Sequence, residues 1–138
     1  MTASAEPESA DNGRPEVPEA ALVAARAAGT RLGQNTVVLA MGEYLGVTDA
    51  FVITSGANSR QVRSIVEEVE HQVKESAGRS PRATEGLRDL TWVLMDYGDF
   101  LVHVFQDEAR AYYDLERLWG NAPRRSGDEI LSDQRVDD

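Results

Sequence analysis

The chain has 138 residues, no cysteine and a formal net charge of −10, which is typical of one acidic domain. The absence of cysteine excludes disulfide bonds and thiol nucleophiles, and with only two histidines it also disfavours a zinc site. No apolar run approaches the roughly 18 residues that cross a bilayer, and the N-terminus lacks the basic and apolar regions of a signal peptide. We therefore expect a cytoplasmic protein without membrane contact.

The distribution of charge indicates the kind of partner. Segments 1–18 and 121–138 hold nine acidic and four basic residues, and the remainder holds fifteen acidic and ten basic residues with no basic cluster. Nucleic-acid binding draws most of its affinity from Lys and Arg. Direct nucleic-acid recognition is therefore disfavoured, whereas a basic protein surface would suit this acidic core.

The two ends of the chain differ from its middle. Residues 1–17 and 121–138 are rich in small and polar residues and show no apolar periodicity. Such segments cannot bury enough apolar surface to offset the entropy lost on ordering. We predict that both are disordered tails and that a single domain occupies residues 18–120.

The first half of this domain predicts one helix and two strands. A helix with high Ala content is expected over 19–28, beginning after Pro18. The β-branched run over 36–40 predicts a short buried strand, and 42–48 a loop with two glycines. A second strand is expected over 50–54.

A long helix follows. Asn58 is a suitable N-cap and Gln61 could complete a reciprocal capping pair, while Gly78 is expected to end the helix. A short edge strand is predicted over 82–84. The long helix should present one apolar stripe, formed by Val62, Ile65, Val66, Val69 and Val73.

Residues 92–119 predict a β-hairpin followed by a closing helix. If Gly98-Asp99 is a two-residue turn, the two-residue period sorts the strand side chains onto two faces. One face is wholly apolar or aromatic and must belong to a core: Val93, Met95, Tyr97, Phe100, Val102 and Val104. The other face combines a large aromatic with an acid and a histidine, which suits a partner-facing surface: Trp92, Leu94, Asp96, Leu101, His103 and Phe105.

The closing helix should begin at an Asp107 cap and carry its apolar residues on one side: Ala111, Tyr112, Leu115, Leu118 and Trp119. The complete order is helix, two strands, helix, two or three strands, helix. This order predicts an α/β fold with a single small mixed β-sheet and helices packed on it.

No arrangement of nucleophile and base is evident. His103 could serve Ser55 or Ser59 as a base, but no pattern places them together, so His103 is expected to be a polar residue on the outer hairpin face. Asp96 and Asp99 flank a tight turn, where acids are common for local backbone reasons. We predict neither a catalytic residue nor a metal site.

The turn over 55–59 joins a strand to a helix N-terminus, where backbone N–H groups can bind an anion. Its spacing matches neither the dinucleotide fingerprint nor the P-loop. A nucleotidyltransferase of similar topology would also need a paired Asp-x-Asp after the turn, and none occurs there. We therefore expect a turn and a helix cap, and no cofactor.

Trp92 allows two interpretations. It could be packed under the closing helix as part of the core, or it could be a protein-binding anchor, because Trp concentrates interface energy when it fills a partner's pocket. Trp119 lies at the end of an apolar helical stripe and is better explained as core.

Several segments together resemble the ribosomal silencing factor (iojap-like) family over about residues 20–120. They are Thr48-Asp-Ala-Phe-Val-Ile-Thr-Ser-Gly56, the helix start Asn58-Ser-Arg-Gln-Val62, Glu85-Gly86, Trp92-Val-Leu-Met-Asp-Tyr-Gly-Asp99, Val102-His-Val104 and Tyr113-x-Leu-Glu-x-Leu-Trp119.

The resemblance implies a function that composition does not indicate. Family members bind the large ribosomal subunit through ribosomal protein L-fourteen, on the face that the small subunit would use. The subunits then cannot join, and translation is repressed when nutrients are scarce. The implied fold has a nucleotidyltransferase-like topology without the catalytic residues, so the protein would not be an enzyme, and dimers occur in the family.

The same resemblance implies which residues contact the partner. The family's partner-binding Trp corresponds to Trp92, and its neighbours on the strand to Val93 and Leu94. We add His103 as a member of the outer hairpin face. The acids expected to pair with basic groups of the partner are Asp96, Asp99 and Glu85.

Two alternatives stay open at this point. One is a nucleotidyltransferase-like enzyme that acts at the 55–59 turn. The other is a homodimeric scaffold whose dimer contact is the outer hairpin face.

Overall fold

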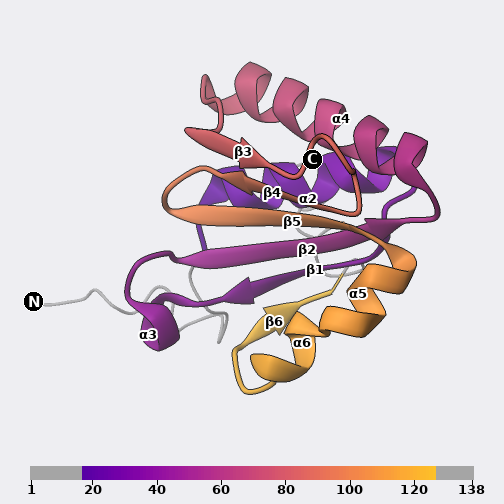
Figure 1. The fold of residues 1–138 in the computed structure, drawn as a ribbon. Helices are drawn as coiled ribbons and strands as arrows, with labels where there is room; N and C mark the ends of the chain where they lie inside the picture. The colour runs from indigo at the N-terminus through magenta and orange to yellow at the C-terminus, as the bar shows by residue number, and fades with distance from the viewer. Residues whose placement is uncertain (1–16, 127–138) are drawn as a thin grey trace, which may run out of the picture.

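The computed structural model describes residues 17–126, which form one six-stranded sheet in the order β3-β4-β5-β2-β1-β6 (Figure 1). Within this range no helix combines the length and the apolar character that a bilayer crossing requires. The elements are α2 (Glu19–Thr30), β1 (Gln34–Ala40), α3 (Gly42–Leu45), β2 (Ala50–Gly56), α4 (Ser59–Ala77), β3 (Ala83–Glu85), β4 (Trp92–Asp96), β5 (Phe100–Gln106), α5 (Asp107–Tyr113), α6 (Leu115–Leu118) and β6 (Arg124–Arg125).

The sheet is mixed, as predicted. β2 pairs with β5 in parallel, and all other neighbouring strands are antiparallel. A parallel pair requires a crossover connection, and here α4 and the β3–β4 segment provide it. α2 and α4 cover one face of the sheet, whereas α5 and α6 lie on the other (Figure 1).

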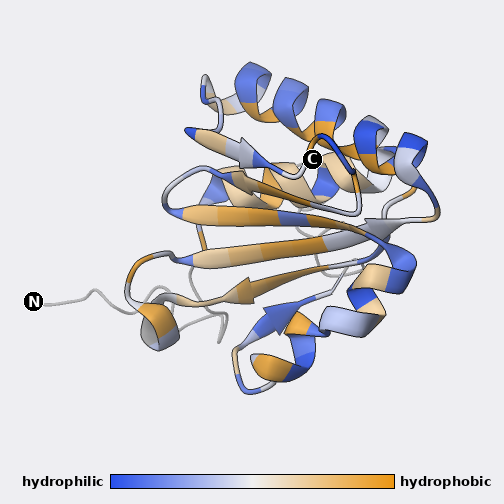
Figure 2. Ribbon diagram, in the orientation of Figure 1, coloured by the Kyte–Doolittle hydropathy of each residue, from blue (hydrophilic) through white to orange (hydrophobic). Residues whose placement is uncertain are grey.

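The main core lies between the sheet and α2 and α4. The predicted stripe of α4 is confirmed, because all five of its residues are buried, and Figure 2 shows the hydrophobic side of α4 turned toward the sheet. α2 meets α4 through buried alanines, whose small side chains allow close approach. The apolar hairpin face is also confirmed: its six residues are at most 5% exposed.

The hairpin register is the predicted one. Met95 pairs with Val102 and Val93 with Val104, and the Tyr97 N–H donates to Phe100 O at 3.0 Å. Gly98, the first central residue of the turn, has φ +93°. This backbone conformation favours glycine because any Cβ would be strained there.

A second, smaller cluster fills the opposite face. Its buried members are Val37, Leu39, Met41, Phe51, Ile53, Phe105, Ala109 and Ala122. Because both faces are covered, every residue of β2 is buried, which explains the continuous apolar run in this strand. The outer hairpin face therefore contributes to a second core through Phe105 and His103, while its other side chains are only half-buried.

The closing helix is not one helix, as predicted, but two. The chain turns at Asp114, which has a left-handed φ of +51°, and this turn separates α5 from α6. The predicted apolar side is confirmed only in part. Leu115 and Trp119 pack against the cluster on this face, whereas Tyr112 is 80% exposed and Leu118 is 68% exposed. Asp107 is the first helical residue rather than the cap, and the preceding Gln106 makes no side-chain cap.

The 42–48 segment also differs from its prediction, because it contains the short helix α3.

The ordered domain further extends past the expected boundary at residue 120. Arg124 and Arg125 pair with Leu39 and Val38 of β1, and Ala122 is buried. A backbone ladder on an edge strand needs no apolar periodicity, so the sequence carries no signal for it. The rest of the predicted tails lies outside the described residues.

Arg110 joins the two short helices to the sheet. Its guanidinium donates to Gln34 O at 2.6 Å and to Asn35 O at 2.7 Å, at a position where the β1–β2 register is irregular. It also forms a two-pronged ion pair with Glu116 at 3.0 Å and donates to Ser55 Oγ at 3.1 Å. Nothing in the sequence pattern pointed to this residue.

We predict that Arg110→Ala lowers the free energy of unfolding by about 3 kcal/mol, because it leaves a half-buried carboxylate and two carbonyls without their donor. Urea denaturation measures this change. Arg117→Ala, an exposed residue of α6, is the matched control and should change stability by less than about 0.5 kcal/mol. Equal stability of the two variants would contradict the role assigned to Arg110.

Candidate functional site

The candidate site is the outer face of β4 and β5. Trp92 pairs with Phe105, Leu94 with His103 and Asp96 with Leu101 across the two strands. The three β4 side chains and Leu101 are half-buried. They form a patch that is partly open to solvent and lies beside the buried rings of His103 and Phe105.

Trp92 lies at the centre of an aromatic group. Its ring stacks on Phe105 with 4.9 Å between centroids and lies 4.7 Å from the ring of Tyr113 on α5. Its Nε1–H donates to His103 Nδ1 at 3.2 Å. The interpretation of Trp92 as core is therefore correct in part, because the ring packs under α5 but is only half-buried. Its role as a protein-binding anchor stays a prediction.

His103 is not the exposed polar residue that we predicted. It is 5% exposed, and its ring lies 4.7 Å from that of Phe51 in an edge-on arrangement. Burial lowers the pKa of His103 to about 4, so the imidazole is neutral near pH 7. Since Nδ1 accepts a hydrogen bond, the ring proton is on Nε2, which has no partner among the described residues.

The idea that His103 acts as a base for a serine is not supported by the geometry. The hydroxyl of Ser55 accepts from Arg110, and the acceptor nitrogen of His103 is used by Trp92. Ser59 is an exposed residue at the start of α4. The arrangement therefore holds an indole in place rather than activating a nucleophile.

Val93 was proposed as a contact residue, and its side chain cannot have that role. It lies on the helix-covered face and is 0% exposed. The reason is the two-residue period of the strand, which turns Val93 away from the face that carries Trp92 and Leu94.

Two of the predicted acids already have partners within the chain. Asp99 pairs with Arg79 at 2.7 Å, and Asp96 pairs with Arg82 at 3.2 Å while accepting from the Gly98 N–H at 2.8 Å. These carboxylates stabilise the hairpin turn. Within residues 17–126 they belong to no cluster of acidic, histidine or cysteine side chains that could hold a metal.

Glu85 differs from these two acids. It ends the edge strand β3, pairs in the backbone with Leu94 and is exposed. No hydrogen bond or ion pair of its side chain is found within the described residues. Glu85 is therefore the predicted acid that is most available to a partner.

The turn over 55–59 is filled by the side chain of Gln61. Its Oε1 accepts from the Ala57 N–H at 2.7 Å, and its Nε2 donates to Arg31 O and Leu32 O at 3.2 and 3.0 Å. The Gln61 N–H is itself capped by Asn58 Oδ1 at 2.9 Å. Asn58 is thus the predicted cap, but Gln61 pairs with Ala57 and not reciprocally with Asn58.

These hydrogen bonds bear on the alternative that the protein is a nucleotidyltransferase-like enzyme acting at the 55–59 turn. Two backbone donors at this turn are already engaged by side chains of the protein, the Ala57 N–H by Gln61 and the Gln61 N–H by Asn58. A Cβ placed on Gly56 would lie 3.0 Å from Gln61 Cγ, so the space beside the turn is also occupied. The turn ties the start of α4 to the α2–β1 connection.

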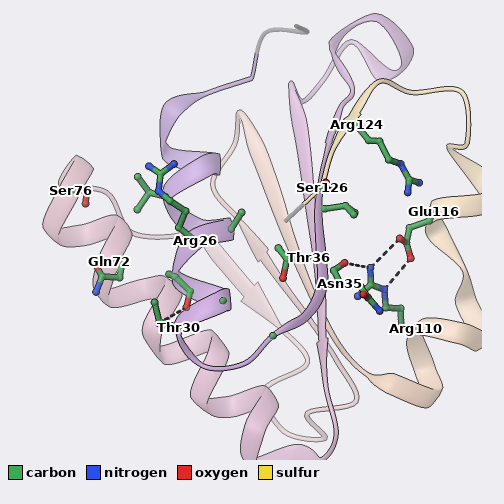
Figure 3. Close-up of a pocket in the computed structure, with 16 residues that line it drawn as sticks. Arg26, Thr30, Asn35, Thr36, Gln72, Ser76, Arg110, Glu116, Arg124 and Ser126 are labelled. Carbon is green, nitrogen blue, oxygen red and sulfur yellow. Dashed lines mark hydrogen bonds and ion pairs between the residues drawn. The ribbon is translucent and has the colours of Figure 1, made fainter. Parts of the chain in front are cut away.

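A groove of about 1180 Å³ lies elsewhere, between α2 and the α5–α6 segment (Figure 3). Its cations include Arg26, which pairs with Glu19 at 3.5 Å, and Arg110, which pairs with Glu116. None of the residues predicted as contacts lines it. The groove is thus separate from the patch around Trp92.

We predict a pH dependence of stability that originates at His103. Its pKa is lowered in the folded state, so the unfolded chain binds a proton that the folded protein does not, and stability is lost as the pH falls from about 6.5 toward 4. The loss approaches about 3 kcal/mol over this window. Urea denaturation of the wild type and His103→Phe at pH 7 and pH 4 measures it.

The variant should lose less stability than the wild type over this pH range, since it removes the titrating group while retaining a ring. Other titrating groups are common to both proteins and cancel in the comparison. Parallel dependence on pH in the two proteins would contradict the assignment.

Comparisons with known proteins agree with this geometry. The family model "Ribosomal silencing factor during starvation" matches residues 14–138. The chain is 39% identical over 101 residues to the ribosomal silencing factor RsfS of Bacillus subtilis, covering 73% of this chain and 85% of the relative.

Two solved structures have the same fold. A crystal structure from Chromobacterium violaceum matches with a TM-score of 0.71 at 32% identity, over 76% of this chain and 87% of that one. A Bacillus halodurans structure matches with a TM-score of 0.63 at 35% identity, over 75% and 92%. The chain belongs to the ribosomal silencing factor family.

Proposed function

We propose that this protein binds the large ribosomal subunit through ribosomal protein L-fourteen and so prevents the small subunit from joining. The observation that carries the proposal is the half-buried Trp92, fixed by its neighbours at one end of the β4–β5 face. Family membership supports ribosome silencing, and this face supports the mode of contact.

The apolar part of the face suits a protein partner. Trp92 and Leu94 come from β4 and Leu101 from β5, and all three retain some exposure. Tyr113 on α5 is 50% exposed and extends the same surface. Aromatic side chains that are already held in position lose little conformational entropy on binding, and such residues often dominate interface energy.

The charge of the protein supports a basic partner. The chain carries −10 overall, and the exposed Glu85 lies at the edge of the face. Asp96 and Asp99 contribute less, because Arg82 and Arg79 already compensate them. An acidic surface increases the rate of association with a basic surface and disfavours wrong partners.

The mechanism is steric exclusion. No bond is made or broken, so the repressor must only occupy a surface that the small subunit needs. Repression then follows occupancy and reverses when the protein dissociates. The protein would act in the cytoplasm and would not be an enzyme. This is supported by Gln61, whose side chain engages the Ala57 N–H of the 55–59 turn and the carbonyl of Arg31.

We predict that Trp92→Ala weakens binding to large subunits by about 30-fold, corresponding to roughly 2 kcal/mol for a lost aromatic anchor. Co-sedimentation with purified subunits on a sucrose gradient measures binding, and depletion of the joined-ribosome peak measures silencing. His71→Ala is the control, because it removes an exposed ring from α4 on the opposite layer, and it should behave as the wild type.

Trp92→Ala also removes packing on Phe105 and Tyr113, so Leu94→Arg serves as a second variant. It places a cation on the same face without changing the Trp92 contacts, and it should abolish co-sedimentation with a basic partner. If wild-type protein stays at the top of the gradient, the proposed function is wrong. If both variants still block joining, another face makes the contact, and monomers formed by Trp92→Ala would instead support the dimer alternative.

We further predict that Glu85→Lys slows association with large subunits about tenfold at low salt, and that the difference from wild type shrinks as salt rises. Stopped-flow or surface-based kinetics at two ionic strengths measure it. Glu67→Lys is the matched control, since it makes the same charge change on the exposed side of α4. Equal effects of the two variants would show that net charge alone, and not the β4–β5 face, determines the rate.

A further inference from the structure

The aromatic cluster around Trp92 contains one polar ring, the imidazole of His103, whose burial is unfavourable for stability. His103 is surrounded by Phe51, Phe105 and Trp92, yet its imidazole is polar and only 5% exposed. Its neighbours on the same face of β5, Leu101 and Phe105, are apolar. An apolar ring would be expected at such a position unless the nitrogens have a use.

Within residues 17–126, only one nitrogen of His103 has a hydrogen-bond partner. Nδ1 accepts from Trp92 Nε1 at 3.2 Å, whereas Nε2 is buried and has no hydrogen-bond partner among the described residues. A buried donor without an acceptor lowers stability. What the imidazole offers that an apolar ring would not is therefore the hydrogen bond that its Nδ1 accepts from the Trp92 indole.

The strand register explains how this contact forms. Trp92 lies directly opposite Phe105 and His103 lies opposite Leu94, so Trp92 and His103 are diagonal neighbours on one face. Aromatic side chains can reach a diagonal neighbour across antiparallel strands. Phe105 thus provides a stacking surface for the indole, and His103 provides a directional acceptor at its edge.

Stacking and hydrogen bonding constrain the indole differently. The contacts with Phe105 and Tyr113 are compatible with more than one rotation of the Trp92 ring, because stacking has little directionality. A hydrogen bond at Nε1 selects one orientation. An anchor already fixed in one orientation loses less entropy when it enters a partner's pocket.

We infer that His103 is a positioning residue: its Nδ1 orients the Trp92 indole for the protein partner without touching that partner itself. The inference rests on the proposed function for its biological meaning. The orientation of the indole, however, can be tested on the isolated protein.

The test compares variants of matched shape. His103→Phe fills the aromatic site without an acceptor. His103→Asn and His103→Leu are nearly equal in size, but only Asn has an acceptor oxygen on Cγ, where the histidine has Nδ1. Three measurements follow for each variant: the Trp92 indole N–H resonance by NMR, the Tm, and the affinity for purified large subunits. The chain has two tryptophans, and the indole N–H signal that disappears in Trp92→Phe is the one that belongs to Trp92.

We expect the indole resonance to lose its hydrogen-bonded shift in His103→Phe and His103→Leu and to keep it in His103→Asn. His103→Phe should retain or raise the Tm while its affinity falls about tenfold. His103→Asn should bind more tightly than His103→Leu although both leave the same space. A purely structural role would instead make affinity follow the Tm in all three variants.

Two outcomes overturn the inference. One is an indole resonance that does not change in His103→Phe and His103→Leu. The other is equal affinity of His103→Asn and His103→Leu when the wild type binds. Failure of the wild type to bind large subunits is a different result, because it overturns the proposed function while the NMR measurement still decides whether His103 orients Trp92.

Discussion

Burial of the sheet on both faces is the constraint on which the rest of this structure depends. β2 and β5 run parallel at the centre of the sheet, so each must present one row of side chains to α2 and α4 and the other to the α5–α6 side. Alternating residues of one hairpin therefore belong to two different cores. Val93 is fully buried against the helices, while the adjacent Trp92 lies in the smaller cluster.

The two cores differ in how completely they are apolar, and this difference bears on function. The helical core combines the α4 stripe with the alanines of α2 and the inner hairpin face. The smaller cluster includes half-buried tryptophans and surrounds a buried imidazole, one nitrogen of which has no partner in the part of the chain that the structure describes. Residues that do not optimise stability are expected where a protein contacts other molecules. The less regular core is thus the one that supports the proposed binding face.

Polar side chains complete the architecture where strands and helices meet. Gln61 occupies the turn at the start of α4, and Arg110 bonds the carbonyls at the irregular start of β1 while pairing with Glu116. Each uses backbone groups that would otherwise be available to a ligand or to water. Gln61 occupies space and one backbone donor at the 55–59 turn, and Arg110 fixes the two short helices beside the proposed binding face.

Local patterns in the sequence by themselves determined the helices α2 and α4, the strands other than β6 and the hairpin register, and they drew attention to Trp92. These features depend on periods of two or 3.6 residues and on Gly98 in its turn, which are interactions between residues near in sequence. The tertiary structure alone decided that His103 is buried, that Asp96 and Asp99 already have arginine partners, and that β6 extends the sheet. Each of these outcomes depends on groups that approach only after folding: the ring of Phe51, the guanidinium of Arg79 and the free edge of β1. A single sequence carries no periodic signal for such contacts, because they join segments whose spacing along the chain is arbitrary.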